Sequence, residues 1–358
     1  PRFLTYPTYS YDANKQDWKS QTNYPIGKLY PERTDSWEVG LDATLFKDFK
    51  LSGSFYYANT YNQTFYADLS LSSGYSNIPI QSGNIMNEGL EMSLGYNKQW
   101  KDFSFNTNYT LTWNKNRVKR LADGVYNYAT GQPIQMPELS PLTYGHTDAR
   151  LILRVGGSMG DVYGQRLLKR DLNGYILNEE GVGLAMENKE TYLGSILPKM
   201  NMGWSLGFGY KGVNLGMTFT GRFGGIVISE TQSVLDAAGV SKVSADVRDA
   251  GGVQINQSKV SAQTYYQTIQ GTAAYYTYSA TNVRLGELSL SYTLPKKWFD
   301  NKVGMTVGLV GKNLWMIYCK APFDPELTTS AASNFYQGFD AYMLPSTRNF
   351  GFNVKFQF

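Results

Sequence analysis

Apolar and polar residues alternate with a period of two along much of the chain, a pattern typical of β-strands with one apolar face. In 348–358, aromatic and aliphatic side chains alternate with Asn, Gly, Lys and Gln. Eight further stretches alternate in the same way: 37–45, 49–57, 90–96, 103–113, 204–210, 213–219, 283–294 and 303–309. The pattern predicts nine strands. The phase changes between Leu285 and Leu288, which predicts a β-bulge near Gly286 and Glu287.

The connections between these strands alternate between short and long. Tight turns are expected around 47–48, 99–102, 211–212 and 295–301, and long loops at about 64–83, 116–200, 224–280 and 313–347. Outer-membrane barrels have short periplasmic turns and long extracellular loops. A soluble all-β sandwich with an aromatic core is the alternative, but it gives no reason to place every long connection at one end. The alternation therefore predicts an all-β protein, a transmembrane antiparallel β-barrel.

The composition agrees with a barrel. Aromatic residues make up 15% of the 358 residues, charged residues only 17%, and there are 36 glycines. The mean hydropathy is -0.36, and no apolar run reaches the ~20 residues that a membrane helix needs. This excludes a helical membrane protein. It leaves room for a barrel, because a barrel strand exposes only every second residue to lipid.

A sheet in hydrocarbon has to close, since its backbone groups must all be paired. Nine strands do not close the usual even-numbered bacterial barrel. No secretory signal precedes Pro1. We therefore expect the chain to be the C-terminal part of a longer protein, with 1–35 as an extracellular loop and 36–358 as barrel. Aromatic residues near strand ends are expected to form the two interfacial girdles: Trp37, Tyr96, Trp113, Trp204, Tyr210 and Tyr292.

Little in the sequence indicates catalysis, a metal or a cofactor. His146 and Cys319 are the single residues of their types, which argues against a histidine-based metal site, a catalytic triad and an internal disulfide. The net charge is +4 without a concentrated basic stripe, so no nucleic-acid partner is expected. Asp324 and Glu326 lie two residues apart in a proline-containing loop, a spacing that favours a structural role over a glycosidase pair.

Acidic and glycine-rich stretches in the long loop at 116–200 are interpreted as turns. Asp161 and Asp171 resemble a calcium loop in composition, but Leu172 stands where an EF-hand has glutamate. Asn173-Gly174 favours a tight turn. The run 156–160 (GGSMG) has no following Lys-Ser or Lys-Thr, so it does not predict a phosphate-binding loop.

Several motifs resemble those of one family of transporters. They are YPERTDSWEVG at 30–40, NEGLE at 87–91, NVRLGELSLSYTLPKKWF at 282–299, VGKNL at 310–314, FDPE at 323–326 and LPSTR at 344–348. Together they resemble the SusC/RagA group of TonB-dependent outer-membrane transporters over nearly the whole chain, most strongly from residue 282 onward. Gly286 and Lys312 each stand where that group usually has arginine.

The resemblance implies a plugged barrel of about 22 strands, of which this chain would be the last nine. The plug and the segment that contacts the TonB complex would precede Pro1. A SusD-like surface lipoprotein would cap the extracellular mouth. Active import of a bulky nutrient, most often an oligosaccharide and sometimes a peptide, is the implied function, with no enzymatic activity and no cofactor.

Aromatic and polar loop residues are the candidates for ligand binding, because aromatic faces stack on sugars while polar groups fix orientation. They are Tyr126, Tyr128, Tyr144, Tyr163, Arg166, Trp315, Phe335 and Tyr336. In the last strand, Phe350, Phe352, Phe356 and Phe358 are expected to face outer-membrane lipid and to act as a signal for the barrel-assembly machinery.

Two other classes of function remain open at this point. A passive porin or an adhesive or structural barrel would share the strands but lack a plug and a TonB-contacting segment. A secreted carbohydrate-binding or hydrolytic β-protein would dissolve without detergent.

Overall fold

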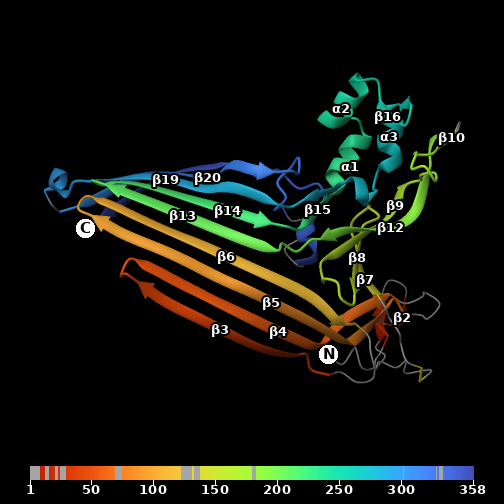
Figure 1. Ribbon diagram of the computed structural model, residues 1–358, viewed down its shortest axis with the longest axis horizontal. Coiled ribbons are helices and arrows are strands. Elements are labelled where there is room, and N and C mark those ends of the chain that lie inside the picture. Colours follow the sequence, from red (N-terminus) through yellow and green to blue (C-terminus); the bar gives the residue numbers. More distant parts are fainter. Residues whose placement is uncertain are drawn as a thin grey trace.

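The computed structural model describes residues 9–12, 16–20, 23–24, 30–68, 75–121, 131–132, 138–179, 183–300, 302–327, 329 and 334–358. Its largest unit is an antiparallel sheet of nine strands, which lie side by side in the order in which they occur along the chain (Figure 1). The strands are β3 (Arg33–Leu45), β4 (Phe49–Asp68), β5 (Asn77–Trp100), β6 (Phe103–Arg120), β13 (Met200–Tyr210), β14 (Val213–Phe223), β19 (Asn282–Leu294), β20 (Gly304–Cys319) and β22 (Asn349–Gln357). The nine predicted strands are confirmed.

The register of the sheet separates an apolar face from a polar one, because directly paired residues project from the same face. One continuous row of pairs crosses six strands on the apolar face: Phe105, Phe208, Leu215, Leu290, Leu309 and Phe352. A row on the opposite face is polar: Lys50, Gly95, Asn108, Ser205, Thr218, Glu287 and Lys312. The apolar face is exposed, with Leu309 60% and Phe352 69% accessible, as expected of a surface that contacts lipid.

The predicted bulge in β19 is confirmed. On β14, Thr218 pairs with Glu287 and the next residue, Phe219, pairs with Leu285, so Gly286 is the extra residue. The bulge restores Val283 and Leu285 to the apolar face although their parity differs from that of Leu288.

Short turns connect the strands at one end of the sheet. The Lys211-Gly212 turn has both residues at positive φ, 46° and 89°. A Cβ on Gly212 would lie 2.7 Å from the backbone oxygen of Thr293, so this position requires glycine. Figure 1 shows the short turns and the C-terminus at one end, and the long connections at the other.

The long connections fold into structure of their own. A four-stranded sheet is formed by β7 (Glu138–Thr143), β8 (Arg150–Arg154), β9 (Asp161–Leu168) and β12 (Met186–Ser195), and a three-stranded one by β15 (Ile226–Ser229), β18 (Thr277–Ser279) and β21 (Phe339–Asp340). Strand pairs are β1 (Tyr9–Asp12) with β2 (Asp17–Ser20), β10 (Asn178–Glu179) with β11 (Gly183–Leu184), and β16 (Val253–Ile255) with β17 (Ser258–Val260). The first loop, expected at 64–83, is largely strand, since β4 continues to Asp68 and β5 begins at Asn77.

Helices occur mainly in the connection between β14 and β19. They are α1 (Glu230–Ala237), α2 (Lys242–Asp249) and α3 (Ala262–Ile269), with 3-10 turns at Ala273–Tyr275, Lys296–Phe299 and Asn334–Gly338. Each α-helix begins at a serine whose side chain accepts a hydrogen bond from a backbone N–H of the first turn: Ser229, Ser241 and Ser261. None of the helices among the described residues has the length and apolar character to cross a bilayer.

The hydrophobic cores lie at the loop end and not within the large sheet. One contains Phe65, Ile80, Ile85, Val118 and Leu153, where the ends of β4, β5 and β6 meet β8. A second is centred on Tyr144, Leu151, Val162, Ile228 and Phe339, and a third lies beneath α3. The described segments of the loops are therefore packed onto one another and onto the strand ends.

Candidate functional site

The polar face of the large sheet is built from small side chains. Between β5 and β6 the Ser93 hydroxyl donates to Asn108 Oδ1 at 3.0 Å, and Thr293 and Thr306 hydroxyls lie 3.1 Å apart between β19 and β20. Glu287 and Lys312 form an ion pair at 3.6 Å on the same face. Small hydroxyl, amide and glycine positions leave room next to the wall while keeping it hydrated, which suits the inner face of a barrel.

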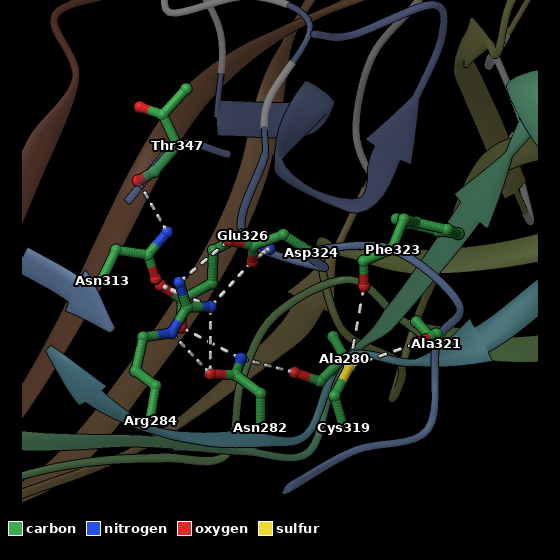
Figure 2. A network of polar contacts seen from close by, with 10 residues as sticks. All are labelled: Ala280, Asn282, Arg284, Asn313, Cys319, Ala321, Phe323, Asp324, Glu326 and Thr347. Carbon is green, nitrogen blue, oxygen red and sulfur yellow. Dashed lines mark hydrogen bonds and ion pairs between the residues drawn. The ribbon is translucent and has the colours of Figure 1, made fainter. Parts of the chain in front are cut away.

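At the loop end of this face, Arg284 of β19 holds the loop that follows β20. Its guanidinium donates to both carboxylate oxygens of Asp324, at 2.7 and 3.0 Å, and lies 3.4 Å from Glu326 Oε2 (Figure 2). The side chains of Arg284 and Asp324 are only 11% and 8% exposed. A bidentate pair of this kind fixes both distance and orientation.

Asn282 completes this network from two residues away on the same strand. Its Oδ1 accepts from Nε and Nη2 of Arg284, each at 3.2 Å, and its Nδ2 donates to Glu326 Oε1 at 3.0 Å. Burial raises the pKa of Asp324 and is the largest single effect. The hydrogen bonds from Arg284, the Glu326 N–H and Ser346, together with the positive charge of Arg284, outweigh burial, and the pKa is lowered. The carboxylate is thus committed to the ion pair. This geometry agrees with the structural role predicted for Asp324 and Glu326.

A cavity of about 660 Å³ lies at the loop end of β6, where this strand separates from β13 and loop segments line the space between them. Its lining includes Trp113, Asn116, Asp161, Tyr192 and Lys199. Asn116 Oδ1 accepts from the Met159 N–H at 2.7 Å, which ties the 156–160 turn to the wall. A mixture of aromatic and amide side chains is suited to binding either an oligosaccharide or a peptide.

Asp161 is the buried acid of this cavity. The Ser158 N–H donates to its Oδ2 at 2.8 Å and the Tyr192 hydroxyl donates to its Oδ1 at 3.2 Å. Burial raises the pKa of Asp161 above its ordinary value, and burial together with the neighbouring Asp161 raises the pKa of Tyr192 to about 12. Asp161 is a structural acceptor for the turn that closes the cavity, and the turn interpretation of this region is consistent with these contacts.

Tyr144 has no free surface for a ligand. It is 0% exposed, its hydroxyl donates to the Phe335 carbonyl at 2.7 Å, and its ring packs against Tyr336 and Phe339. Phe335 and Tyr336 pack against the same core and are half-buried. The structure thus brings three predicted ligand residues together, but as a core that joins two long loops.

Tyr163 and Arg166 lie on β9. The Arg154 guanidinium carbon lies 4.5 Å from the centroid of the Tyr163 ring, and the ring centroids of Tyr163 and Tyr192 are 5.3 Å apart. Arg166 Nε lies 3.6 Å from Asp148 Oδ2. The Arg166 side chain is 40% exposed. These two residues remain candidates for contact with a ligand.

Trp315 lies on the lipid-facing side of the wall. It pairs with Leu285, and its side chain is among the exposed apolar residues. A ligand inside a barrel would not reach that face, so Trp315 is better explained as an interfacial aromatic residue. Tyr126 and Tyr128 lie outside the described residues.

The four aromatic residues predicted as an assembly signal lie on the exposed apolar face: Phe350, Phe352, Phe356 and Phe358. Phe352 pairs with Leu309 and Phe356 with Met305, which places them in the apolar rows. Their role in assembly stays a prediction.

The sequence pattern missed Arg284 and Asn282 as members of a polar network. The phase change at Gly286 was the available signal, because it places Arg284 on the inner face. It also missed the cavity beside β6, whose lining comes from several separate segments of the chain.

Known proteins resemble the chain along nearly all of its length. TonB-dependent receptor P3 of Formosa agariphila is 26% identical over 365 residues, which covers 94% of this chain and 35% of the receptor. TonB-dependent receptors P39 and P26 of the same organism are 22% and 23% identical. The chain spans about a third of the length of these curated relatives. No protein-family model matches.

Solved structures show the same fold. The RagAB peptide importer in its 'closed-closed' state matches this chain with a TM-score of 0.67 at 17% sequence identity. The match covers 98% of this chain and 38% of the importer chain. Its 'open-open' state matches 100% of the chain with a TM-score of 0.66. The chain therefore has the RagA-type β-barrel fold, and its location is the outer membrane. The predicted resemblance to the barrel of SusC/RagA-type TonB-dependent transporters is confirmed at the level of fold and relatives, which are receptors and transporters and not enzymes.

Proposed function

We propose that the protein containing this chain imports a bulky nutrient across the outer membrane by a TonB-dependent mechanism. This chain supplies barrel wall and extracellular loops. The observation that carries the proposal is the wall itself, an uninterrupted nine-stranded meander with an apolar outer and a small-residue polar inner face, in a fold shared with an importer. A bulky solute needs a wide barrel, and outer-membrane transporter barrels of about 22 strands have a plugged lumen.

The substrate class we propose is an oligosaccharide, in line with the resemblance to the SusC/RagA group. A peptide is the second candidate, and one observation favours it, since RagAB is a peptide importer. The cavity beside β6 offers Tyr192 together with asparagine amides, groups that bind either class.

The proposed partner at the extracellular mouth is a SusD-like lipoprotein. The loops support this proposal because they form a packed platform: Arg284 holds the 320–327 loop, and Tyr144 joins the loop before β8 to the Asn334–Gly338 turn. A fixed surface loses little conformational freedom when a second protein binds. Energy would come from the TonB complex through the region of the protein that contacts it.

Purification of the full-length protein from native membranes in detergent tests these proposals. A lipoprotein and a carbohydrate or peptide should co-purify, and mass spectrometry of the bound material identifies the class. Uptake of that material by cells should stop when TonB is deleted. A barrel that is recovered alone and conducts ions constitutively in a planar bilayer would instead indicate a passive porin.

A further inference from the structure

Three positions at the loop end of β6 follow one another on the lipid-facing side of the wall. Trp113 pairs with Leu90, Lys115 with Glu88, and Arg117 with Met86. Two residues advance a strand by ~7 Å, which is ~5 Å along the membrane normal at the usual tilt. Lys115 and Arg117 therefore lie roughly 5 and 10 Å beyond Trp113, within the layer of lipid headgroups that begins where the hydrocarbon ends.

Positive charge on this surface exceeds negative charge. Lys115 is paired with Glu88 at 3.0 Å, whereas Arg117 has no ion-pair partner in the described part of the chain. By contrast, Arg33 at the end of β3 is neutralised by Asp35 at 2.9 Å.

The cavity described above opens beside these cations, with Trp113, Lys115, Arg117 and Lys199 in its lining. One backbone donor also faces it. The N–H groups of Asn114 and Val118 donate to the carbonyls of Lys199 and Gly157, at 3.2 and 2.8 Å. Alternate residues of a strand direct their N–H groups to the same edge, so the Asn116 N–H points to the gap between these two bonds.

In the described part of the chain, the Asn116 N–H has no hydrogen-bond acceptor on that edge. An unpaired edge N–H beside two cations suits an oxyanion, because a phosphate accepts hydrogen bonds and ion pairs together. Asp161 is the opposing carboxylate in the lining, and its two oxygens are occupied by the Ser158 N–H and the Tyr192 hydroxyl.

We propose that this notch binds the phosphate of a glycolipid of the outer leaflet. Lys115, Arg117 and the Asn116 N–H hold the phosphate, and the acyl chains lie along the apolar row of Trp113, Leu90 and Phe55. The lipid site requires only the outer-membrane barrel. It is independent of which nutrient the protein carries.

Binding of lipid A to the full-length protein in detergent tests the proposal. The probes are fluorescent bis-phosphorylated lipid A, the same lipid without phosphates, and inorganic phosphate as competitor. The double variant K115Q/R117Q should bind phosphorylated lipid A about tenfold more weakly than the wild type. The dephosphorylated lipid should bind all forms equally and weakly.

A matched control lies at the opposite end of the wall. K296Q/K297Q also removes two exposed cations beside an exposed tryptophan, Trp298, and should leave lipid binding unchanged. The single variant R117Q preserves the Lys115–Glu88 pair and serves if the double variant fails to fold. Equal binding by wild type and R117Q would overturn the proposal. Displacement by inorganic phosphate at the lipid's own binding concentration would show a free-anion site and would overturn the lipid assignment.

Discussion

Arg284 is a buried arginine of the wall, and its ion pair with Asp324 holds the loop after β20 in place. Replacing Arg284 by Met leaves Asp324 buried without its partner, a change that costs about 3–5 kcal/mol in comparable buried pairs. We expect amide hydrogen exchange in 320–327 to accelerate strongly while exchange in the wall stays slow. Arg33→Met is the matched control, because the exposed Arg33–Asp35 pair contributes at most about 1 kcal/mol. Unchanged exchange in R284M would show that the loop is held by other contacts.

The same ion pair makes the loop sensitive to acid. The pKa of Asp324 is lowered in the folded protein, so its contribution to stability is complete above the ordinary aspartate pKa of ~4 and is lost as pH falls through the lowered value. Exchange in 320–327 should therefore increase only below about pH 4. Asp324→Asn should show fast exchange already at pH 7 and no further acid step. An increase between pH 7 and pH 5 in the wild type would assign the transition to another group.

Single residues were predictable where strand parity determines their environment. Phe350 and Phe352 lie on the apolar face as the alternation indicated. Trp315 was expected in a long loop, because the alternation of the predicted strand ends at Leu309, whereas β20 continues to Cys319. The burial of Tyr144 depends on Phe335, 191 residues away, and no local pattern contains that contact.

At the scale of elements, the bulge in β19 absorbs Gly286 as an extra residue, so Leu285 and Leu288 share the lipid-facing side and Arg284 faces inward. Deleting Gly286 would leave Leu285 opposite Phe219 and Glu287 opposite Thr218, so Arg284 should keep its inward position and its ion pair. We expect the deletion to retain the folded, heat-modifiable fraction of the full-length protein on gels.

Gly286→Ala separates the bulge from the glycine itself. An added Cβ would meet no atom closer than 3.6 Å, so the alanine variant should fold like the wild type. Loss of the folded fraction in the deletion but not in the alanine variant would show that β19 needs the extra residue, and with it the bend of the bulge, to fit its neighbours.

The nine wall strands were predictable because each has one lipid-facing side, which imposes alternation on the sequence. The elements inside the long loops were not predicted. Strands such as β10 and β16 have only two and three residues, too few to show a period. The helices did carry a signal, since Ser241 and Ser261 are N-cap residues, but helices of eight residues surrounded by loop sequence give a weak apolar period.

At the scale of the molecule, the two faces of the wall should respond oppositely to the same substitution. Leu290 faces lipid and Ser289 faces the barrel interior, one residue apart on β19. Leu290→Arg should lower the free energy of unfolding in lipid vesicles by about 2–4 kcal/mol, whereas Ser289→Arg should change it little. Urea titration monitored by tryptophan fluorescence measures both. A larger effect at Ser289 would reverse the assignment of the faces.

The overall architecture could be predicted because the strands of the wall lie side by side in chain order, as the alternation of short and long connections indicated. The arrangement of the loops above the wall could not, because their cores combine segments such as Leu151, Ile228 and Phe339 from three different connections. Which side chains meet a ligand depends on that arrangement.

The chain segment between β14 and β19 begins and ends in one pair of antiparallel strands, β15 and β18. Ile226, Val227 and Ile228 of β15 pair with Ser279, Tyr278 and Thr277 of β18, so the ends of the helical segment are adjacent in space. Such closure makes the segment exchangeable, because an inserted domain needs neighbouring termini and not a particular length. We expect that α1, α2 and α3 can be exchanged as one cassette while the wall keeps its register.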